Sequence, residues 1–222
     1  MNDLTLIIPS KKESESLPIF LKELEIYNFK KLVVLEKNDI ETKESILNVK
    51  NIEILEQKKI GYGNALIEGI NATTTNFCCI INADGSMDPK YLHEMLNRCQ
   101  NTDFVFTSRY SNGGGSDDDN IITYIGNKLF SLIGKIFFNL KISDILFTYI
   151  LGKTEKFKDL NLKFGDFRIC VELPICIKKK NFEYISISSY ERSRIGGKKK
   201  VNALKDGFLI LTAMITLFFN NK

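Results

Sequence analysis

The chain has 222 residues, of which 44% are hydrophobic, so it is long enough to bury one sizeable core. Its 31 Lys and Arg residues against 27 Asp and Glu give a net charge of +4, without the dense basic stripe of a nucleic-acid-binding protein. The single histidine, His93, excludes a metal site built from several histidines and argues against Ser-His or Cys-His catalysis.

Cysteine usage and the N-terminus indicate the compartment. Five cysteines are an odd number without zinc-ligand spacing, and Cys78-Cys79 lies inside an apolar run, which is typical of reduced thiols. Asn2, Asp3 and Lys11 break the pattern of a signal peptide. The apolar run 207–219 is shorter than the roughly 18–20 residues that span a bilayer. We therefore expect a cytoplasmic protein, which leaves open a peripheral contact with the cytoplasmic face of a membrane.

Strands and helices alternate through the first 110 residues. Apolar runs predict strands at 4–9, 31–36, 51–57, 77–83 and 103–109. Helical spacing predicts helices at 14–28, at 63–74 and from Pro89, with a short polar helix ending at Ile46. This alternation predicts an α/β fold with a mostly parallel, twisted sheet flanked by helices.

The remaining residues have a different character. A loop, "SNGGGSDDDN" (111–120), precedes the apolar segment 121–142, whose lysines recur every six or seven residues. "FRICVELPICIKKK" follows, then a predicted strand at 182–192, a glycine-lysine loop and an amphipathic helix from Val201. No internal repeat or linker is present, so we expect a single domain.

Two glycines introduce the helix at 63–74. "GYGNALIEG" lacks the third glycine of a dinucleotide fingerprint and the Gly-Lys-Ser/Thr of a P-loop. Gly61 and Gly63 therefore mark either an ordinary turn or a close approach of backbone amides to an anionic ligand at a helix N-terminus.

The strand at 77–83 ends in two oxygen-bearing side chains. Asn82 and Asp84 are separated by one residue, so on extended backbone they point the same way and reach one cation. Ser86 or backbone carbonyls add further ligands. Mg²⁺ or Mn²⁺ held by so few protein groups completes its shell with phosphate oxygens and water. The alternative is a turn at the strand end in which Asp84 caps the backbone.

Three blocks together resemble family 2 glycosyltransferases. They are "GYGNALIEGINATTTNFCCIINADGSMDPKYLHEML", "DFVFTSRYSNGG" and "YERSRIGGKKKVNALKDGF", in the family's order. The branch they resemble is that of the polyprenyl-phosphate (dolichyl-phosphate) mannosyl- and glucosyltransferases. The resemblance implies a single GT-A domain, the nucleotide-diphospho-sugar transferase fold. Within it, 1–110 form the nucleotide-sugar-binding half, 111–200 the acceptor-side half and 201–222 a C-terminal amphipathic helix.

The resemblance also implies roles for individual residues. The positions that match the nucleotide side of the site are Pro9, Glu13 and Glu36. The positions that match the metal and diphosphate motif are Asn82, Ala83 and Asp84, with Ser86 near a further ligand position. The positions that match basic residues near the phosphates and the acceptor are Arg109, Arg194 and Lys200, and Asp144 matches an aspartate on the acceptor side.

Four departures from the family pattern bear on activity. "PSKKE" (9–13) has Lys11 where the family has an aromatic residue near the base. Glu36-Lys37 replaces a pair of aspartates, and Asn82 replaces the first aspartate of the metal motif. Asp144 is followed by "ILFTYILGK" in place of small residues and an arginine.

The resemblance predicts an inverting glycosyltransferase that uses Mg²⁺ or Mn²⁺ and a nucleotide-diphospho-sugar donor. The expected acceptor is a polyprenyl phosphate, which needs cations rather than a general base; Asp84 and Arg109 then act on the diphosphate. With a sugar hydroxyl of a glycan as acceptor, Asp144 is the candidate base. A non-catalytic nucleotide-sugar-binding module is a further alternative, favoured by Lys11, Lys37 and Asn82.

Segments 121–142 and 201–219 raise the question of a membrane. An apolar helix is usually packed in a core or against another subunit, which would suit a homo-oligomer. The alternative is a helix in the bilayer interface, with Lys128, Lys135 and Lys141 toward lipid headgroups, that guides a polyprenyl acceptor.

Overall fold

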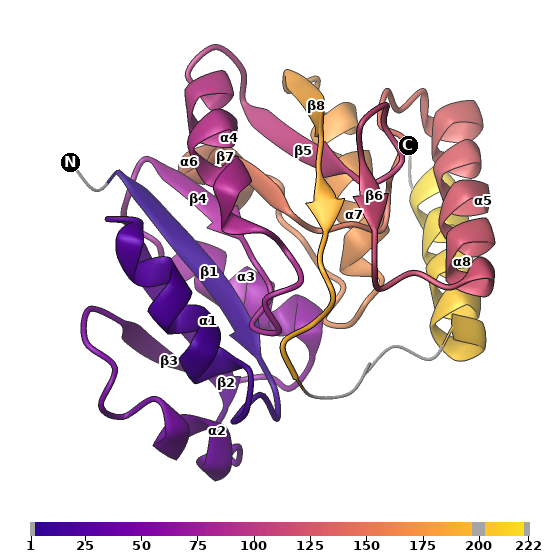
Figure 1. Cartoon of the computed structure of the whole chain (residues 1–222). Helices are drawn as coiled ribbons and strands as arrows, with labels where there is room; N and C mark the ends of the chain where they lie inside the picture. The colour runs from indigo at the N-terminus through magenta and orange to yellow at the C-terminus, as the bar shows by residue number, and fades with distance from the viewer. Residues whose placement is uncertain (1–2, 197–202, 220–222) are drawn as a thin grey trace.

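The centre of the fold is a seven-stranded sheet with the order β3-β2-β1-β4-β7-β5-β8 (Figure 1). The computed structural model describes residues 3–196 and 203–219. The strands are β1 (Leu4–Ser10), β2 (Lys30–Glu36), β3 (Glu53–Gln57), β4 (Phe77–Ile80), β5 (Phe104–Ser108), β7 (Ile150–Lys153) and β8 (Tyr184–Ser188). All neighbours are parallel except β7, which runs antiparallel to both β4 and β5. The predicted mostly parallel sheet is confirmed.

Helices cover both faces of the sheet (Figure 1). On one face lie α1 (Leu17–Glu23) with the 3-10 turn η1 (Leu24–Ile26), and α4 (Leu92–Cys99), which follows the turn η2 (Pro89–Tyr91). On the other face lie α3 (Tyr62–Ala72), α6 (Thr154–Asp159) and α7 (Ile169–Lys179). The short α2 (Ile40–Ser45) links β2 to β3. The sheet therefore has a hydrophobic core on each face. Because side chains alternate along a strand, Leu6 and Ile8 of β1 belong to the core on the side of α1 and α4, and Ile7 belongs to the core on the side of α3, α6 and α7.

β7 and α6 are among the elements that the sequence analysis did not predict. β7 lies in the apolar run after Asp144, between two other strands and with both faces buried. A four-residue strand of this kind has no period-two alternation, so its pattern does not distinguish it from any other buried segment. Its position in the middle of the sheet is set by pairing with β4 and β5.

Two predicted strands differ from the observed ones at their ends. β4 stops at Ile80, three residues before the end expected, so residues 81–83 lie beyond the ladder. The strand expected at 182–192 divides into β8 and β9 (Tyr190–Glu191). β9 leaves the main sheet and pairs in parallel with β6 (Gly115–Ser116), which brings the loop 111–120 against the segment after β8.

Two apolar helices, α5 (Ile121–Phe138) and α8 (Ala203–Phe219), lie side by side outside α7 (Figure 1). Phe218 of α8 contacts the rings of Phe137 and Phe138 of α5, with centroids 5.8 and 6.0 Å apart. Among the described residues, α5 is the one helix that is long and apolar enough to cross a membrane.

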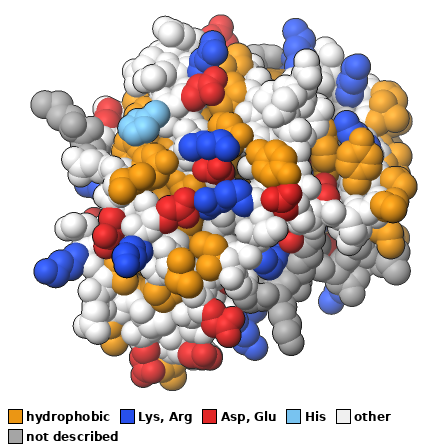
Figure 2. All heavy atoms as spheres, viewed as in Figure 1, with side chains coloured by type: hydrophobic (Ala, Val, Ile, Leu, Met, Phe, Trp, Pro, Cys, Tyr) orange, Lys and Arg blue, Asp and Glu red, His pale blue; other side chains and the backbone are white. Residues whose placement is uncertain are grey.

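Much of this helix pair is exposed. Five of the exposed apolar side chains of α5 follow the spacing of one helical stripe: Ile122, Ile125, Leu129, Leu132 and Ile136. Ile121, Tyr124 and Phe137 are exposed beside this stripe. On α8 the exposed apolar side chains are Phe208, Leu211, Ile215, Phe218 and Phe219. Figure 2 shows hydrophobic side chains gathered on the edge of the molecule where α5 lies. We call the five stripe residues of α5 and the five residues of α8 the apolar platform. A surface patch of this kind marks an interaction site more often than scattered exposed residues do.

Gly152 of β7 tests how tightly the centre of the sheet is packed. A Cβ at this position would lie 2.4 Å from Cδ1 of Phe104 and 2.9 Å from Cε2 of Phe157. We expect Gly152→Ala to lower the free energy of unfolding by about 1–3 kcal/mol, because the aromatic side chains must move off their rotamers. Urea denaturation measures the change. Gly126→Ala is the control: a Cβ at Gly126 in α5 meets no atom within 4 Å, so alanine is expected to stabilise the helix there. Equal stability of the two variants would contradict this account.

Candidate functional site

The predicted site residues converge on one edge of the sheet. Pro9, Glu36 and Arg109 lie at or just beyond the carboxyl ends of β1, β2 and β5, and Asp84 follows β4. These strands run in the same direction, so their carboxyl ends meet at the same edge. β7 runs the opposite way, so the residues that precede it, Asp144 among them, come to the same edge. The topology therefore assembles the site from five strands.

The two carboxylate oxygens of Asp84 have different surroundings. Oδ1 accepts hydrogen bonds from the backbone N–H and the hydroxyl of Ser86, at 3.1 and 2.8 Å. Oδ2 lies 3.6 Å from Nη1 of Arg194. The capped turn that the sequence left as an alternative is therefore present, and it leaves one oxygen of Asp84 facing outward. Ser86 is almost fully buried and its hydroxyl donates to Asp84, so in this structure it orients the aspartate, and its role as a metal ligand remains a prediction.

Asn82 is held by a residue that the sequence analysis did not single out. The hydroxyl of Tyr62 lies 3.2 Å from Oδ1 of Asn82 and 2.6 Å from the hydroxyl of Thr148. The ring of Tyr62 stacks on Phe167, with centroids 5.0 Å apart. Burial raises the pKa of the Tyr62 hydroxyl, so it remains a neutral donor. The signal in the sequence was the aromatic residue between the two glycines of "GYG".

The donor set at this tip fits a divalent cation only together with a ligand. The described residues contain no group of three or more His, Cys, Asp or Glu side chains arranged to hold a metal. Asp84 contributes one outward oxygen, and Asn82 contributes a neutral amide beside it. Mg²⁺ and Mn²⁺ are bound in this way when a phosphate-bearing ligand supplies the remaining oxygens.

Arg109 and Asp144 are bound to each other. Nε and Nη2 of Arg109 donate to the two oxygens of Asp144, at 2.7 and 2.9 Å, while Nη1 lies 3.0 Å from Glu191 and 3.7 Å from Asp119. Arg109 and Asp144 are both buried. Burial disfavours the charged arginine, but the hydrogen bonds and charge of Asp144 outweigh it and hold the pKa of Arg109 well above its usual value.

The roles predicted for Arg109 and Asp144 remain predictions. In this structure the guanidinium of Arg109 is paired with carboxylates, and Asp144 is held in a buried bidentate pair. The pair joins the end of β5 to the segment before β7, and Glu191 adds β9. Burial raises the pKa of Glu191. Neither Glu191 nor Asp119 was singled out from the sequence, where nothing distinguishes them from the acids around them.

Residues 190–196, which we call the strap, cross over the tip that carries Asp84. The backbone N–H of Arg192 donates to the carbonyl of Ser86, and that of Ile195 donates to the carbonyl of Asp84, both at 2.9 Å. Gly85 has a φ of +74°, and a Cβ there would lie 2.4 Å from Cδ1 of Ile195. The strap thereby positions Arg194 next to Asp84. Nη2 of Arg194 also donates a hydrogen bond to Oδ2 of Asp118, in the loop 111–120, at 3.1 Å.

The nucleotide side of the edge is more open. A hollow of about 380 Å³ lies at the ends of β2 and β3, and Glu36, Lys37, Asn38, Glu56, Gln57, Lys58 and Ile60 line it. Nζ of Lys11 pairs with Glu36 at 2.8 Å, so the two departures from the family pattern contact each other. Glu13 is buried and accepts a hydrogen bond from Ser16 at 2.5 Å. Lys200, also predicted here, lies outside the described residues.

Gly61 and Gly63 allow the backbone of residues 164–166 to pack closely against the start of α3. A Cβ on Gly61 would lie 2.3 Å from the carbonyl oxygen of Gly165, and one on Gly63 would lie 2.1 Å from that of Phe164. The carbonyl of Gly165 also accepts a hydrogen bond from the N–H of Asn64, at 3.0 Å. The first turn of α3 is therefore covered by residues 164–166, which favours the ordinary turn over a close approach of these glycines to a ligand.

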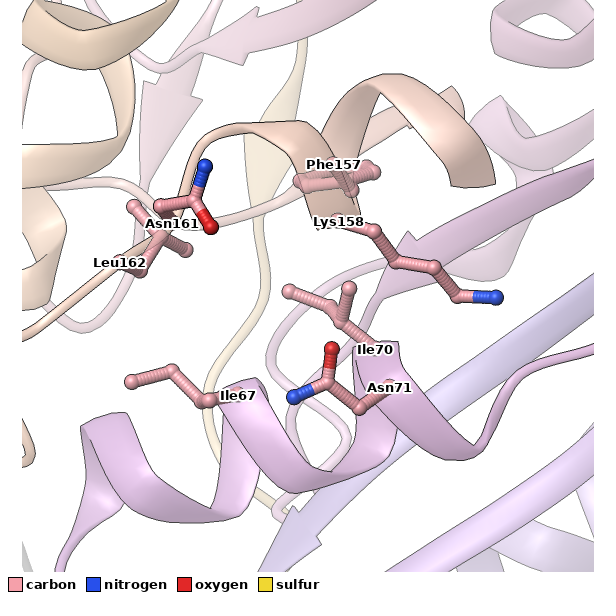
Figure 3. A pocket seen from close by; sticks show the side chains of 7 residues that line it. All are labelled: Ile67, Ile70, Asn71, Phe157, Lys158, Asn161 and Leu162. Atoms are coloured by element: carbon pink, nitrogen blue, oxygen red, sulfur yellow. The ribbon is translucent and has the colours of Figure 1, made fainter.

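A second hollow, of about 210 Å³, lies between α3 and α6 (Figure 3). Its lining combines apolar and polar side chains: Ile67, Ile70, Asn71, Phe157, Lys158, Asn161 and Leu162. None of the predicted site residues lines it, so it is separate from the edge described above.

The model of the family described as glycosyl transferase family 2 matches residues 5–160, so the chain belongs to this family. Uncharacterized glycosyltransferases of Mycobacterium bovis and Mycobacterium tuberculosis are each 31% identical to it over 96 residues. The match covers 41% of this chain and 43% of each relative, so the chain spans less than half the length of these relatives.

Solved structures share the fold at low sequence identity. Glucosyl-3-phosphoglycerate synthase from M. tuberculosis, in complex with Mn²⁺, UDP and glucosyl-3-phosphoglycerate, has a TM-score of 0.73 and 10% identity over 97% of this chain and 80% of its own. Another mycobacterial protein has a TM-score of 0.73 and 8% identity over 97% of this chain and 74% of its own. The predicted fold, a single α/β domain of the GT-A type, is confirmed.

Asp144→Asn tests the buried ion pair. The substitution leaves Arg109 buried with its main partner neutralised, so we expect a loss of about 3–5 kcal/mol in the free energy of unfolding, measured by urea denaturation. The matched control is Asp159→Asn, which removes an exposed pair with Lys180 at 3.2 Å and is expected to cost about 0–1 kcal/mol. Comparable losses in the two variants would contradict the structural role assigned to Arg109 and Asp144.

Proposed function

We propose that the protein is a metal-dependent glycosyltransferase that moves a hexose, with inversion, from a nucleotide-diphospho-sugar to a polyprenyl phosphate. The observation that carries the proposal is the edge of the sheet. There Arg194 approaches Asp84, two residues after Asn82, and a hollow lies at the ends of β2 and β3 on the same edge. Family membership and the GT-A fold support a transferase of this class.

The donor is assigned to the hollow and the tip of β4. Asp84 and Asn82 would hold Mg²⁺ or Mn²⁺, which supplies positive charge where the departing diphosphate gains negative charge. Arg194 adds a guanidinium on the same side. Structures of the M. tuberculosis synthase with UDP and either Mn²⁺ or Mg²⁺ support the use of a divalent cation with the nucleotide in this fold.

The acceptor is inferred from the burial of Asp144, the carboxylate that was the candidate base. A hydroxyl acceptor needs a base, and Asp144 is buried in its pair with Arg109. A phosphate acceptor is already ionised and needs none. The M. tuberculosis synthase binds phosphoglyceric acid or glycerol 3-phosphate together with UDP-glucose, which supports a phosphorylated compound as the second ligand in this fold.

The apolar platform favours a lipid-linked form of that acceptor. It exposes ten apolar side chains on two adjacent helices. α5 contains two lysines and no acidic residue, which suits an anionic lipid surface better than a second copy of the same cationic face. We propose that the protein is cytoplasmic and that the platform contacts the cytoplasmic leaflet.

Asp84→Asn tests the donor site. Turnover of UDP- and GDP-linked hexoses is measured with polyprenyl phosphate, with and without Mn²⁺. We expect the variant to lose about 10²–10³ of the Mn²⁺-dependent rate, because the charge that holds the cation is removed. The control, Asp103→Asn, removes a carboxylate that pairs with Lys153 at the opposite edge of the sheet and is expected to retain the rate. Full activity of Asp84→Asn would remove Asp84 from the site.

The same transfer assay, together with calorimetry of donor binding, separates the rival functions. Transfer to soluble glycans in preference to polyprenyl phosphate would favour a hydroxyl acceptor. Donor binding by calorimetry without transfer or hydrolysis would favour a non-catalytic nucleotide-sugar-binding module.

Flotation with anionic liposomes at low salt tests the platform. We expect the wild-type protein to float, and the double variant Ile125→Glu with Leu132→Glu to remain at the bottom, because two charges oppose burial of the stripe in the interface. Both side chains are more than half exposed, so the fold is expected to persist. Ile26→Glu is the control, since Ile26 is 81% exposed on η1, away from the platform. Failure of the wild-type protein to float would favour a soluble acceptor.

A further inference from the structure

Arg194 approaches the carboxylate that the proposed function assigns to the cation. Nη1 lies 3.6 Å from Oδ2 of Asp84, the oxygen that Ser86 leaves outward, and Nη2 lies 3.1 Å from Asp118. Each contact uses a single nitrogen, unlike the bidentate pair of Arg109 with Asp144. A guanidinium placed in this way neutralises Asp84 without being locked to it.

One donor of Arg194 is unused. Nε is buried and has no hydrogen-bond partner among the described residues. A buried N–H without a partner is costly, and the cost is recovered when an acceptor oxygen arrives. The side chain as a whole is 22% exposed, so a ligand contacts its exposed atoms first, and Nε, which is buried, meets an acceptor only when the side chain rotates.

The charge around Arg194 is acidic. Asp84, Asp118 and Glu13 each contribute a negative charge that favours the charged guanidinium, so one positive charge offsets three negative ones. Nη1 of Arg194 lies 3.6 Å from Oδ2 of Asp84, so a divalent cation bound to this oxygen would be repelled by the guanidinium, because both carry positive charge.

We propose that Arg194 takes the place of the cation at Asp84 in the donor-free protein and is drawn away by the diphosphate of the donor. Metal and donor then bind cooperatively: the diphosphate accepts from Arg194, and Asp84 becomes available to the metal. The inference rests on the proposed function and adds a binding order to that function. The metal binds weakly until the nucleotide is present. Arg194 is a positioning residue in this scheme.

The strap allows this movement in the side chain alone. Hydrogen bonds from Arg192 and Ile195 to the tip fix the backbone on both sides of Arg194. The pair of Arg192 with Glu23, at 2.8 Å, anchors the strap further. The guanidinium therefore exchanges Asp84 for a phosphate by rotation about its own side-chain bonds, while Asp118 remains within reach.

A titration with Mn²⁺ tests the proposal. Free Mn²⁺ is measured by electron paramagnetic resonance with the full chain, first alone and then with UDP or GDP present. Arg194→Gln is expected to tighten Mn²⁺ binding to the nucleotide-free protein by about tenfold, the size expected when a partly exposed charge is removed at this distance. The factor by which nucleotide raises Mn²⁺ affinity is expected to fall correspondingly, and linkage requires the same fall in the effect of Mn²⁺ on nucleotide affinity.

Two further variants separate this effect from others. Arg194→Lys keeps the positive charge and is expected to keep weak Mn²⁺ binding near the wild-type value. Lys90→Gln removes an equal charge from an exposed side chain that pairs with Asp88 instead of Asp84, and is expected to leave Mn²⁺ binding unchanged. Circular dichroism of each variant verifies the fold. If Arg194→Gln misfolds, Arg194→Met is used for the same comparison.

The outcomes distinguish this inference from the proposed function. Tighter nucleotide-free binding in Arg194→Gln, with Lys90→Gln unchanged, supports it. Unchanged or weaker Mn²⁺ binding in Arg194→Gln, while the wild-type protein still binds Mn²⁺ with nucleotide, overturns the inference and leaves the proposed function standing. Absence of Mn²⁺ binding in every variant, with and without nucleotide, overturns both.

Discussion

The buried ion pair between Arg109 and Asp144 is the interaction on which the edge of the sheet depends. It joins the end of β5 to the segment that leads into β7, and Glu191 extends it to β9. A buried charge is tolerated only when its partners are present, so these segments have to assemble together. The strap begins at β9, and its position over Asp84 follows from this network. The pair of Arg109 and Asp144, which the sequence marks for its resemblance to site residues, therefore holds these segments together in the structure.

The antiparallel strand β7 is the second constraint. It occupies the place between β4 and β5, and it brings Asp144 and Thr148 to the same edge as the ends of the parallel strands. Thr148 contacts Tyr62, and Tyr62 contacts Asn82. One short strand thus connects the segment that carries Asn82 to the segment that carries Asp144, and its own residues line neither of the two hollows described above.

The site and the apolar platform are linked along the chain. The strap crosses the tip of β4, and α8, which contributes half of the platform, follows it in sequence. α5 follows the loop 111–120, whose Asp118 contacts Arg194. One helix of the platform therefore follows the strap, which contains Arg194, and the other follows the loop whose Asp118 pairs with Arg194. A surface contact and the donor site are thereby carried by neighbouring parts of one fold.

The sequence by itself determined the alternation of strands and helices, the edge at which the site lies and the family, because periodicity and local motifs are properties of short stretches. It also placed Asn82 and Asp84 at the end of β4. Only the tertiary structure decided what each polar group faces: Arg109 meets Asp144, Gly63 meets Phe164, and Arg194 meets Asp84. These partners lie between 35 and 110 residues apart in the chain. Such contacts depend on β7 and the strap, whose positions are set by pairing between distant segments and leave no pattern in the local sequence.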